Sequence, residues 1–441
     1  MKDEYTALRD NDTWDYVAPE PHMNVLGSKW VYKVKQKVDG TIDRLKSRLV
    51  AKGYDQQDGI YFNETFSPVV KCTTVRVVLC MAITYNWQIR QLDVSNAFLH
   101  GFLDKDIYMS QPQGFINPYY PSNYKSVSDN SMFVCTSKDG MLVLLLYVDD
   151  ILLTGSSSIL MNDLIISLRK EFAMKELEEL GYFLGLEAVR NPTSITLTQN
   201  KYTLELLDKA KLLDSKPCDT PVVKGARLSI HDGVKLDNVT DYRAIVGGLQ
   251  YLTMKRPDIC FVVNYVSQFM HFPSDLHLQL VKRILRYLKG TIGLGITLTK
   301  GSLCALKAFT DSDWDGCPDT RRSTSGFAVF LGPNLVSWSS KKQPTISKSS
   351  AEAEYKCLSV ASAELKWISY ILADLHVKLD SPALLLCENI SALATNPVFQ
   401  ARTKHIEIQY HTVRELVDEG FLELHHITSE NQIAYLFIKG L

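Results

Sequence analysis

The chain lacks the features that mark secreted, zinc-binding or membrane-spanning proteins. Its nine cysteines are odd in number and nowhere spaced as Cys-x-x-Cys, which argues against a disulfide framework or a zinc site and fits a reducing compartment. The opening MKDEYTALRD has no apolar core of a signal peptide, and no apolar run approaches the length of a membrane span. We therefore expect an intracellular protein, cytoplasmic or nuclear, without a membrane partner.

An excess of charge of either sign is also lacking. The net charge of the 441 residues is −1, so any binding of nucleic acid has to come from local basic surfaces. With 46% hydrophobic residues the chain can bury several cores, and its length favours roughly two to four domains.

Two adjacent carboxylates interrupt an apolar stretch. The segment LLLYVDDILLTG (residues 144–155) places Asp149 and Asp150 between two apolar runs, which predicts a β-hairpin buried on at least one face. Aspartate is common at hairpin tips, so a turn that faces water is one interpretation. The other is a cation site, because neighbouring carboxylates in such a place repel each other and require a positive charge.

A third carboxylate follows a short predicted strand upstream. In NWQIRQLDVSNAFLHG (residues 86–101) the strand ends at Asp93, which either caps the next turn or joins Asp149 and Asp150. Three carboxylates at strand ends are what two divalent cations need to hold an attacking and a leaving oxygen during phosphoryl transfer. Together with a basic segment upstream, this pattern makes a polymerase the sharpest hypothesis.

Two basic stretches are candidates for contact with phosphates. Residues 29–52, KWVYKVKQKVDGTIDRLKSRLVAK, alternate basic and apolar residues around Asp-Gly, a strong hairpin signal. The predicted helix SDLHLQLVKRILRYLKG (residues 274–290) gathers further basic residues on one face. A solvated charged surface is the alternative for both stretches. The candidates are Lys33, Lys35, Lys46, Arg48, Lys282, Arg286 and Lys289.

The rest of the chain divides into helical and mixed segments. DLIISLRKEFAMKEL (residues 163–177) predicts an amphipathic helix, residues 218–238 a linker, and residues 241–290 a helical region. A second α/β unit is predicted to begin near residue 304, with a strand that runs into Asp311 and a strand that turns at Glu388. Its long helix begins with the capping box Ser349-Ser-Ala-Glu352, which gives Glu352 a structural role that is as plausible as a catalytic one.

Eight segments, taken in order, resemble the reverse transcriptase and ribonuclease H parts of the Pol polyprotein of copia-type LTR retrotransposons. They are KWVYKVKQKVDGTIDRLKSRLVAKGYDQQDGIYFNETFSPVVK, QLDVSNAFLHG, YVDD, DYRAIVGGLQYL, FTDSDWDG, RRSTSGFAVFLG, SSAEAEY and ARTKHIEIQYH. The resemblance covers nearly the whole chain. It implies an α+β right-hand polymerase followed by a ribonuclease H-like α/β domain. The expected ranges are fingers and palm at 1–217, a linker with a thumb-like connection at 218–303, and the ribonuclease H-like domain at 304–441.

The resemblance also implies roles for the polymerase carboxylates. Asp93 and Asp149 would ligate two Mg²⁺ ions with help from the Val94 carbonyl, and Asp150 would complete the site. The expected substrates are an RNA template, a DNA primer and deoxynucleoside triphosphates. Phe98 matches the family's aromatic gate against a ribose 2′-hydroxyl. The parent family works inside a cytoplasmic virus-like particle.

Further roles follow for the basic residues and the second unit. Lys46 and Arg48 are candidates for the triphosphate, and the helix around Lys282 for the duplex backbone. Asp311 and Glu352 match the first two metal carboxylates of ribonuclease H, which hydrolyses the RNA strand of an RNA/DNA hybrid.

The sequence departs from the family pattern at four places. Between residues 111 and 135 a helix-sized, nucleotide-binding block with Leu-Tyr-Gly-Leu-Lys-Gln has no counterpart, and QPQGF runs into a Pro- and Tyr-rich stretch that cannot begin a helix. Glu388 stands where the family has Asp, and Tyr435 where it has a fourth carboxylate. Met1 is expected to match an internal position of a longer ancestral frame.

These departures predict that both activities are impaired, the ribonuclease H activity severely, because a phenol is a poor Mg²⁺ ligand and a longer carboxylate misplaces its oxygens. Two alternatives stay open. One is a non-catalytic nucleic-acid-binding remnant, and the other is a product without function.

Overall fold

The structure is a computed structural model that describes most of the chain. It covers residues 25–26, 28–36, 42–51, 70–94, 108–109, 131–148, 150–172, 174–177, 181–183, 185–223, 227–389 and 404–440. Side chains are described at 30–32, 70–94, 131–148, 150–172, 174–175, 181, 183, 185–223, 227–389 and 411–440. Among the helices described, none combines the length and apolar character needed to cross a membrane.

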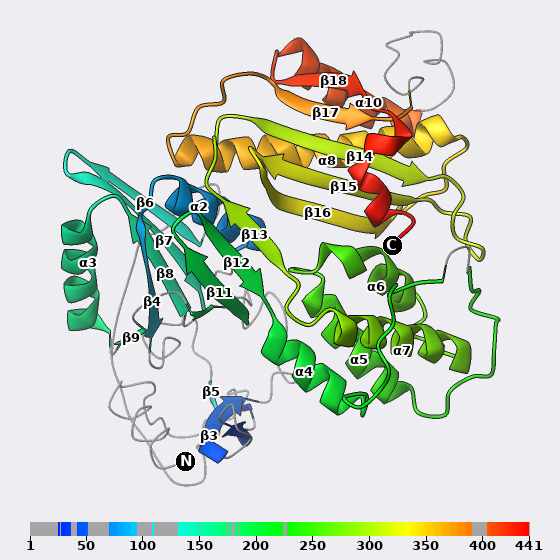
Figure 1. The fold of residues 1–441 in the computed structure, drawn as a ribbon, viewed down its shortest axis with the longest axis horizontal. Coiled ribbons are helices and arrows are strands. Elements are labelled where there is room, and N and C mark those ends of the chain that lie inside the picture. Colours follow the sequence, from blue (N-terminus) through cyan, green and yellow to red (C-terminus); the bar gives the residue numbers. More distant parts are fainter. Residues whose placement is uncertain are drawn as a thin grey trace.

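A five-stranded antiparallel sheet forms the first unit, called the palm unit below. In the order of the sheet, its strands are β6 (Met132–Ser137), β7 (Gly140–Tyr147), β8 (Asp150–Gly155), β4 (Gln88–Val94) and β9 (Met174–Leu177). Helix α2 (Cys72–Thr84) packs on one face and α3 (Ser158–Glu171) on the other (Figure 1). Strands β7 and β8 are therefore covered on both faces, which explains why their sequences GMLVLLLY and DILLTG are largely apolar.

The hairpin predicted from LLLYVDDILLTG is confirmed. Strands β7 and β8 pair antiparallel from Leu142 opposite Gly155 to Tyr147 opposite Asp150. Alternate side chains of this ladder enter two different cores, Leu145 with α2 and Leu153 with α3.

The helix predicted for residues 163–177 is wrong in both of its bounds. Helix α3 begins after Ser157, whose side chain caps the Leu160 N–H, and ends at Glu171. Residues Met174–Leu177 form the edge strand β9 instead, paired with β4. The apolar spacing of the segment fitted a helix, but hydrogen bonds offered by the neighbouring strand decided its structure.

A second, smaller sheet and a group of helices follow. The sheet consists of β10 (Tyr182–Phe183), β11 (Leu186–Asn191), β12 (Ser194–Thr198) and β13 (Ile296–Thr299). The helices are α4 (Asn200–Lys209), α5 (Val239–Leu252), η3 (Pro257–Ile259), α6 (Cys260–Ser267) and α7 (Asp275–Gly290), which share a core of their own. Since β12 pairs with β13, this sheet joins segments from both sides of the boundary at 217 that the sequence suggested.

The C-terminal unit is a mixed five-stranded sheet with helices packed against it. Its strands in order are β16 (Asn334–Lys342), β15 (Thr324–Leu331), β14 (Leu306–Asp313), β17 (Ala383–Cys387) and β18 (Leu422–His426). The first three strands pair antiparallel, and β14, β17 and β18 pair parallel. Helix α8 (Ser350–Asp374), helix α10 (Lys404–Asp418) and the short turns η5 (Ser429–Asn431) and η6 (Ile433–Phe437) complete the unit. This is the ribonuclease H-like arrangement that the sequence predicted.

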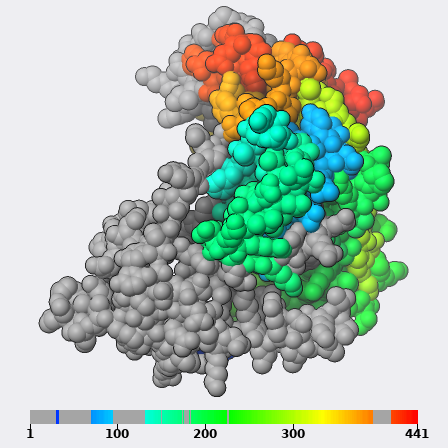
Figure 2. Space-filling model, turned by 90° about the vertical axis from the view of Figure 1, so that its left-hand side faces the viewer, coloured from blue at the N-terminus to red at the C-terminus, as the bar shows by residue number. Residues whose placement is uncertain are grey.

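The units share buried contacts. One apolar core runs from α2 through β12 and β13 to β16 and α8. At its edge, the ammonium of Lys71 lies 3.9 Å from the ring centroid of Trp367 in α8, and His376 lies 3.1 Å from the Thr136 hydroxyl of β6. In Figure 2 the blue and cyan segments of the palm unit lie directly beside the orange segments of the C-terminal unit.

Two further strand pairs lie near the N-terminus. Strands β2 (Ser28–Gln36) and β3 (Ile42–Ala51) pair antiparallel, as predicted for residues 29–52. Strand β1 (Val25–Leu26) pairs in parallel with β5 (Tyr108–Met109).

Candidate functional site

Two of the three predicted polymerase carboxylates lie directly opposite each other. Asp93 near the end of β4 pairs in register with Asp150 at the start of β8. Directly opposed residues of an antiparallel pair project on the same face with their Cβ atoms about 4.5–5.5 Å apart. Asp149 lies outside the described residues, between Val148 and Asp150. Val94, whose carbonyl was predicted to help, is 7% exposed.

The turn before these carboxylates is strained. Val148 has φ 59°, a left-handed conformation in which a β-branched side chain is unfavourable. It follows directly on Tyr147, the last residue of β7 and the register partner of Asp150. The hairpin therefore turns abruptly at the point where its carboxylates stand.

Sequence reasoning missed a basic neighbour of this site. On the other side of β4, Lys175 of β9 is the register partner of Asp93. The row Asp150, Asp93 and Lys175 thus crosses three adjacent strands and places one cation beside two carboxylates. The position of Lys175 beside Asp93 follows only from the pairing of β9 with β4, and the sequence of β9 was interpreted as part of a helix.

Most of the predicted nucleic-acid contacts cannot be followed to their side chains. The backbones of Lys33 and Lys46 are register partners in the β2–β3 hairpin, and Arg48 is opposite Val31. Lys35 is opposite Arg44. Phe98 and the block between residues 111 and 130 lie outside the described residues.

The basic face predicted on α7 is partly occupied. Lys289 donates to the Ser215 carbonyl at 2.6 Å, so it fastens the segment after α4. Arg286 is half-buried and its carbonyl accepts from the Cys218 N–H, whereas Lys282 is exposed. Of the three, Lys282 is the one whose side chain the structure leaves exposed to solvent.

In the C-terminal unit, two buried carboxyl groups meet. Asp311 in β14 is 4% exposed and Glu354 in α8 is 6% exposed. The Ser312 N–H donates to Asp311 Oδ1 at 2.8 Å and lies 3.2 Å from Glu354 Oε1. Burial, together with the hydrogen bond and charge of Asp311, raises the pKa of Glu354 to about 9, and burial also raises the pKa of Asp311.

The residue beside Asp311 is therefore Glu354 and not Glu352, to which the sequence analysis gave this role. Glu352 accepts from the Lys348 N–H at 2.8 Å and pairs with Lys356 at 2.9 Å. Two residues along an α-helix differ by about 200° in direction, so the two glutamates of SAEAEY cannot serve the same site. Half of the capping box predicted from the sequence is present: the Ser349 side chain accepts from the Glu352 N–H, whereas the Glu352 carboxylate accepts from the Lys348 N–H and not from the Ser349 N–H.

The remaining two positions of this site also converge. Strands β14 and β17 pair in parallel with Thr310 opposite Cys387, so Asp311, within β14, and Glu388, directly after β17, lie on neighbouring strands. The Tyr435 hydroxyl donates to Glu388 Oε2 at 2.5 Å, and the Ser429 hydroxyl donates to Oε1. Burial acts to raise the pKa of Glu388, but the hydrogen bonds from Ser429 and Tyr435 outweigh it and hold the pKa below its usual value.

The chemistry of these groups suits a cation only in part. Asp311 Oδ2 is buried without a hydrogen-bond partner, which is the state of an oxygen that a cation or a shared proton would satisfy. Glu388, in contrast, already accepts from two hydroxyls, and Lys439 lies 3.7 Å from the ring centroid of Tyr435. Within the described part of the chain, no group of three or more His, Cys, Asp and Glu side chains is placed to hold a metal ion.

Comparisons with known proteins agree with the resemblance seen in the sequence. The family described as reverse transcriptase (RNA-dependent DNA polymerase) matches residues 11–125 and 120–224. Over its whole length, the chain is 44% identical to the retrovirus-related Pol polyprotein from transposon RE1 of Arabidopsis thaliana. The match covers 32% of that polyprotein. It is also 34% identical to the corresponding polyprotein from transposon TNT 1-94 of Nicotiana tabacum, and this match covers 36% of that polyprotein.

The chain spans about a third of the length of these curated relatives. Among solved structures, a foamy viral protease-reverse transcriptase in complex with double-stranded DNA is similar at a TM-score of 0.47 and 11% identity, covering 95% of this chain and 73% of that one. The chain belongs to the reverse transcriptase family, in the form found in the Pol polyproteins of copia-type retrotransposons.

Proposed function

We propose that the chain is an RNA-directed DNA polymerase whose palm unit carries out two-metal phosphoryl transfer, at reduced activity in this copy. The observation that carries the proposal is the register of Asp93 with Asp150 at the base of a strained hairpin. Two like charges directly opposite in a sheet are destabilising unless a cation lies between them. Family membership supplies the reaction class.

The residues divide the work as follows. Asp93, Asp149 and the Val94 carbonyl would hold two Mg²⁺ ions, and these ions would stabilise the charge on the attacking and leaving oxygens. Asp150, directly opposite Asp93, adds a second negative charge to this face of the sheet. Lys175, on the other side of Asp93, would partly neutralise the two carboxylates when no metal is bound. The nucleotide contacts of Lys46, Arg48 and Phe98 belong to the same proposal.

The impairment rests on the region between residues 111 and 135. The two segments matched by the family overlap at residues 120–125, inside this region. The comparison with the transposon RE1 polyprotein runs over 475 positions, 34 more than the 441 residues of the chain (475 − 441). The break in the family match at residues 120–125 supports the loss, in this region, of a block that would otherwise bind nucleotide and cover the palm.

For the C-terminal unit we propose that it still binds an RNA/DNA hybrid but does not cleave the RNA strand efficiently. Asp311 and Glu354 keep the geometry of a carboxylate pair, but Tyr435 supplies a hydroxyl where a fourth carboxylate would be needed. Because a neutral phenol is a poor ligand for Mg²⁺, the second ion would bind weakly.

Primer extension tests the polymerase proposal. Purified full chain, poly(rA)/oligo(dT), deoxythymidine triphosphate and Mg²⁺ should give slow synthesis that disappears in Asp149→Asn/Asp150→Asn. Folding of both proteins is checked by urea unfolding. Absence of synthesis from a folded wild-type protein refutes the proposal, and synthesis that persists in the variant assigns it to a contaminant.

A further inference from the structure

An exposed tryptophan stands three residues after the buried Asp311. Trp314 follows β14 and half of its side chain, 50%, is exposed to solvent. An exposed indole offers solvent a large, flat apolar face that a partner can cover. Its position is nevertheless fixed, because the indole Nε1–H donates to the Ser347 carbonyl at 2.9 Å.

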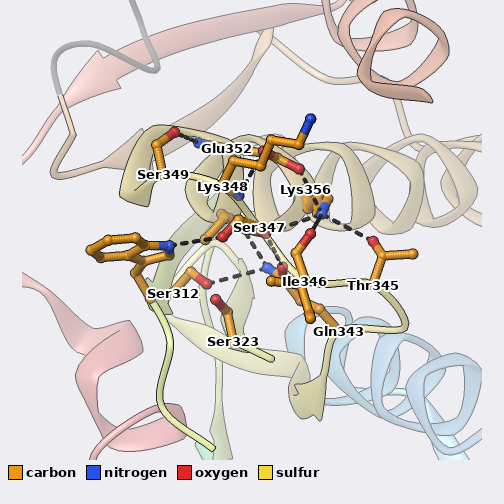
Figure 3. Close-up of polar contacts among 12 residues, drawn as sticks. Ser312, Ser323, Gln343, Thr345, Ile346, Ser347, Lys348, Ser349, Glu352 and Lys356 are labelled. Atoms are coloured by element: carbon orange, nitrogen blue, oxygen red, sulfur yellow. Dashed lines mark hydrogen bonds and ion pairs between the residues drawn. The ribbon is translucent and has the colours of Figure 1, made fainter. Parts of the chain in front are cut away.

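The loop that fixes Trp314 is itself held by a buried polar network. Gln343, which is 4% exposed, donates to the Ser325 hydroxyl and the Ala353 carbonyl, both at 2.9 Å, and accepts from the Ser347 hydroxyl at 2.8 Å. Lys356 donates in turn to the Ser347 hydroxyl at 3.0 Å. Figure 3 shows Gln343, Ser347 and Lys356 pointing toward one another in this network.

Lys356 also secures the remainder of the loop. Its ammonium donates to the Thr345 hydroxyl at 3.0 Å and to the Ile346 carbonyl at 3.2 Å, while pairing with Glu352 at 2.9 Å. Residues 343–349 are thus held by Lys356 of α8 and by Gln343, the residue that follows β16. A surface that is rigid before it binds loses little conformational entropy on binding.

The two segments that meet at Trp314 carry several basic residues. Lys348 follows Ser347 directly, and in Figure 3 its side chain points away from the network. Lys342 reaches Cys317, in the loop after Trp314, at 2.8 Å, which brings the end of β16 to the same place. The charged residues of segments 313–322 and 341–349 are the basic Arg321, Arg322, Lys341, Lys342 and Lys348 and the acidic Asp313, Asp315 and Asp319.

We infer that Trp314 is a stacking platform for an unpaired nucleotide of a single-stranded polynucleotide, with Lys341, Lys348 and Arg322 contacting its phosphates. A rigid exposed indole among exposed cations is the combination that binds single strands without regard to sequence. Asp315 pairs with Arg321, Asp319 accepts from Ser229 and from the Ile230 N–H, and Asp313 accepts from the Thr324 N–H, so all three acidic groups have partners within the protein. The inference rests on the proposed function in that it supposes nucleic acid at the C-terminal unit.

The platform differs from the carboxylate site in what it recognises. Asp311 and Glu354 would act on a scissile phosphate through metal, whereas an indole face accepts any base through stacking. Stacking on an aromatic side chain changes affinity about 5- to 150-fold per base. A strand held at Trp314 would lie beside Asp311 without having to be cleaved.

The test is binding of a fluorescein-labelled oligo(dT) of about 20 nucleotides to the full chain, followed by anisotropy in the presence of EDTA. We expect Trp314→Ala to weaken binding on the order of tenfold and Trp314→Phe to retain most of it. Trp314→Phe keeps an aromatic face but removes the bond to Ser347, so a purely structural role would make both variants equally weak. Tyr370→Ala, at another aromatic side chain with 52% exposure, is the matched control and should bind like wild type.

A second variant tests the phosphate contacts separately from the stacking. Lys341→Glu/Lys348→Glu, at two exposed positions, should weaken binding and lower the dependence of affinity on salt. Unchanged binding by Trp314→Ala, equal losses in Trp314→Ala and Trp314→Phe, or no binding by wild type overturns the inference. The binding assay contains no free metal and no deoxynucleoside triphosphate. Binding that depends on Trp314 is therefore independent of the outcome of primer extension, and failure of the one proposal is distinguishable from failure of the other.

Discussion

The guanidinium of Arg76 lies 3.9 Å from the ring centroid of Trp338 and so joins α2 of the palm unit to β16 of the C-terminal unit. Arg76 also donates to the Val336 carbonyl at 2.5 Å and to the Met254 carbonyl at 2.6 Å. The Trp338 indole donates to the Thr253 carbonyl at 3.0 Å. One buried arginine therefore fastens the palm unit, the helical region and the C-terminal sheet to one another.

Replacement of Arg76 should destabilise the whole chain. In Arg76→Met, two carbonyls lose charged donors, which predicts a loss of about 2–4 kcal/mol in the free energy of unfolding. Burial lowers the pKa of Arg76 to about 10, so the side chain is still charged at neutral pH. Urea unfolding measures the change. Arg190→Met, at a surface arginine 3.4 Å from the Asn86 side chain, is the control, and an equal loss there would contradict the prediction.

Restoration of the ribonuclease H carboxylates should restore cleavage. Tyr435→Asp combined with Glu388→Asp removes the phenol that donates to Glu388 at 2.5 Å and supplies the shorter acid. We expect Mg²⁺-dependent hydrolysis of the RNA strand of a labelled hybrid, against little or none in wild type, because four carboxylates can hold two ions. Loss of the gained activity in an added Asp311→Asn is the control. No gain from a folded double variant would show that the defect lies elsewhere.

The same restored background distinguishes the two glutamates of α8. Glu354→Gln should abolish the gained cleavage, since Glu354 shares the Ser312 N–H with Asp311. Glu352→Gln should retain most of it and cost about 1 kcal/mol of stability, because it alters the cap and the ion pair with Lys356. The reverse order of effects would support the assignment made from the sequence alone.

These two glutamates show which parts of the site can be predicted from the sequence alone. The capping-box pattern predicts where α8 begins, and the resemblance implies that one acid of SAEAEY lies beside Asp311. The choice between Glu352 and Glu354 depends on which face of the helix meets β14. That face is set by packing of the whole unit. Strongly patterned elements, such as the hairpin of β7 and β8, were predicted correctly because alternation and turn chemistry are local.

Strand β9 shows the opposite case. Its four residues continue the apolar spacing of α3, so no local signal separates them from the helix. Only the open edge of β4 draws them into the sheet and brings Lys175 opposite Asp93. The site residue that the sequence missed is thus a consequence of a contact between segments about 80 residues apart.

The strain at Val148 predicts a gain in stability on substitution by glycine. At φ 59° a valine is disfavoured by about 1 kcal/mol or more, whereas glycine adopts this conformation freely, so Val148→Gly should raise the free energy of unfolding by about 0.5–1 kcal/mol. Urea unfolding without metal is the measurement. Val189→Gly, at an exposed valine in strand β11, should instead lower stability, and a loss in both variants would argue against strain at Val148.

The thiol of Cys317 offers a prediction that depends on pH. Burial acts to raise its pKa, but hydrogen bonds from Lys342, 2.8 Å away, and from Thr320 outweigh burial and lower the pKa. Since the thiolate is the reactive form, Lys342→Met should raise this pKa, move the midpoint of alkylation by iodoacetamide to higher pH, and slow modification at neutral pH. Peptide mass spectrometry of Cys317 after brief exposure across pH 5–9 follows the shift. The control is Lys341→Met, which removes a charge from the neighbouring, exposed position of the same strand and should leave the midpoint of alkylation unchanged. Equal shifts in both variants would show that the effect comes from net charge and not from the contact with Lys342.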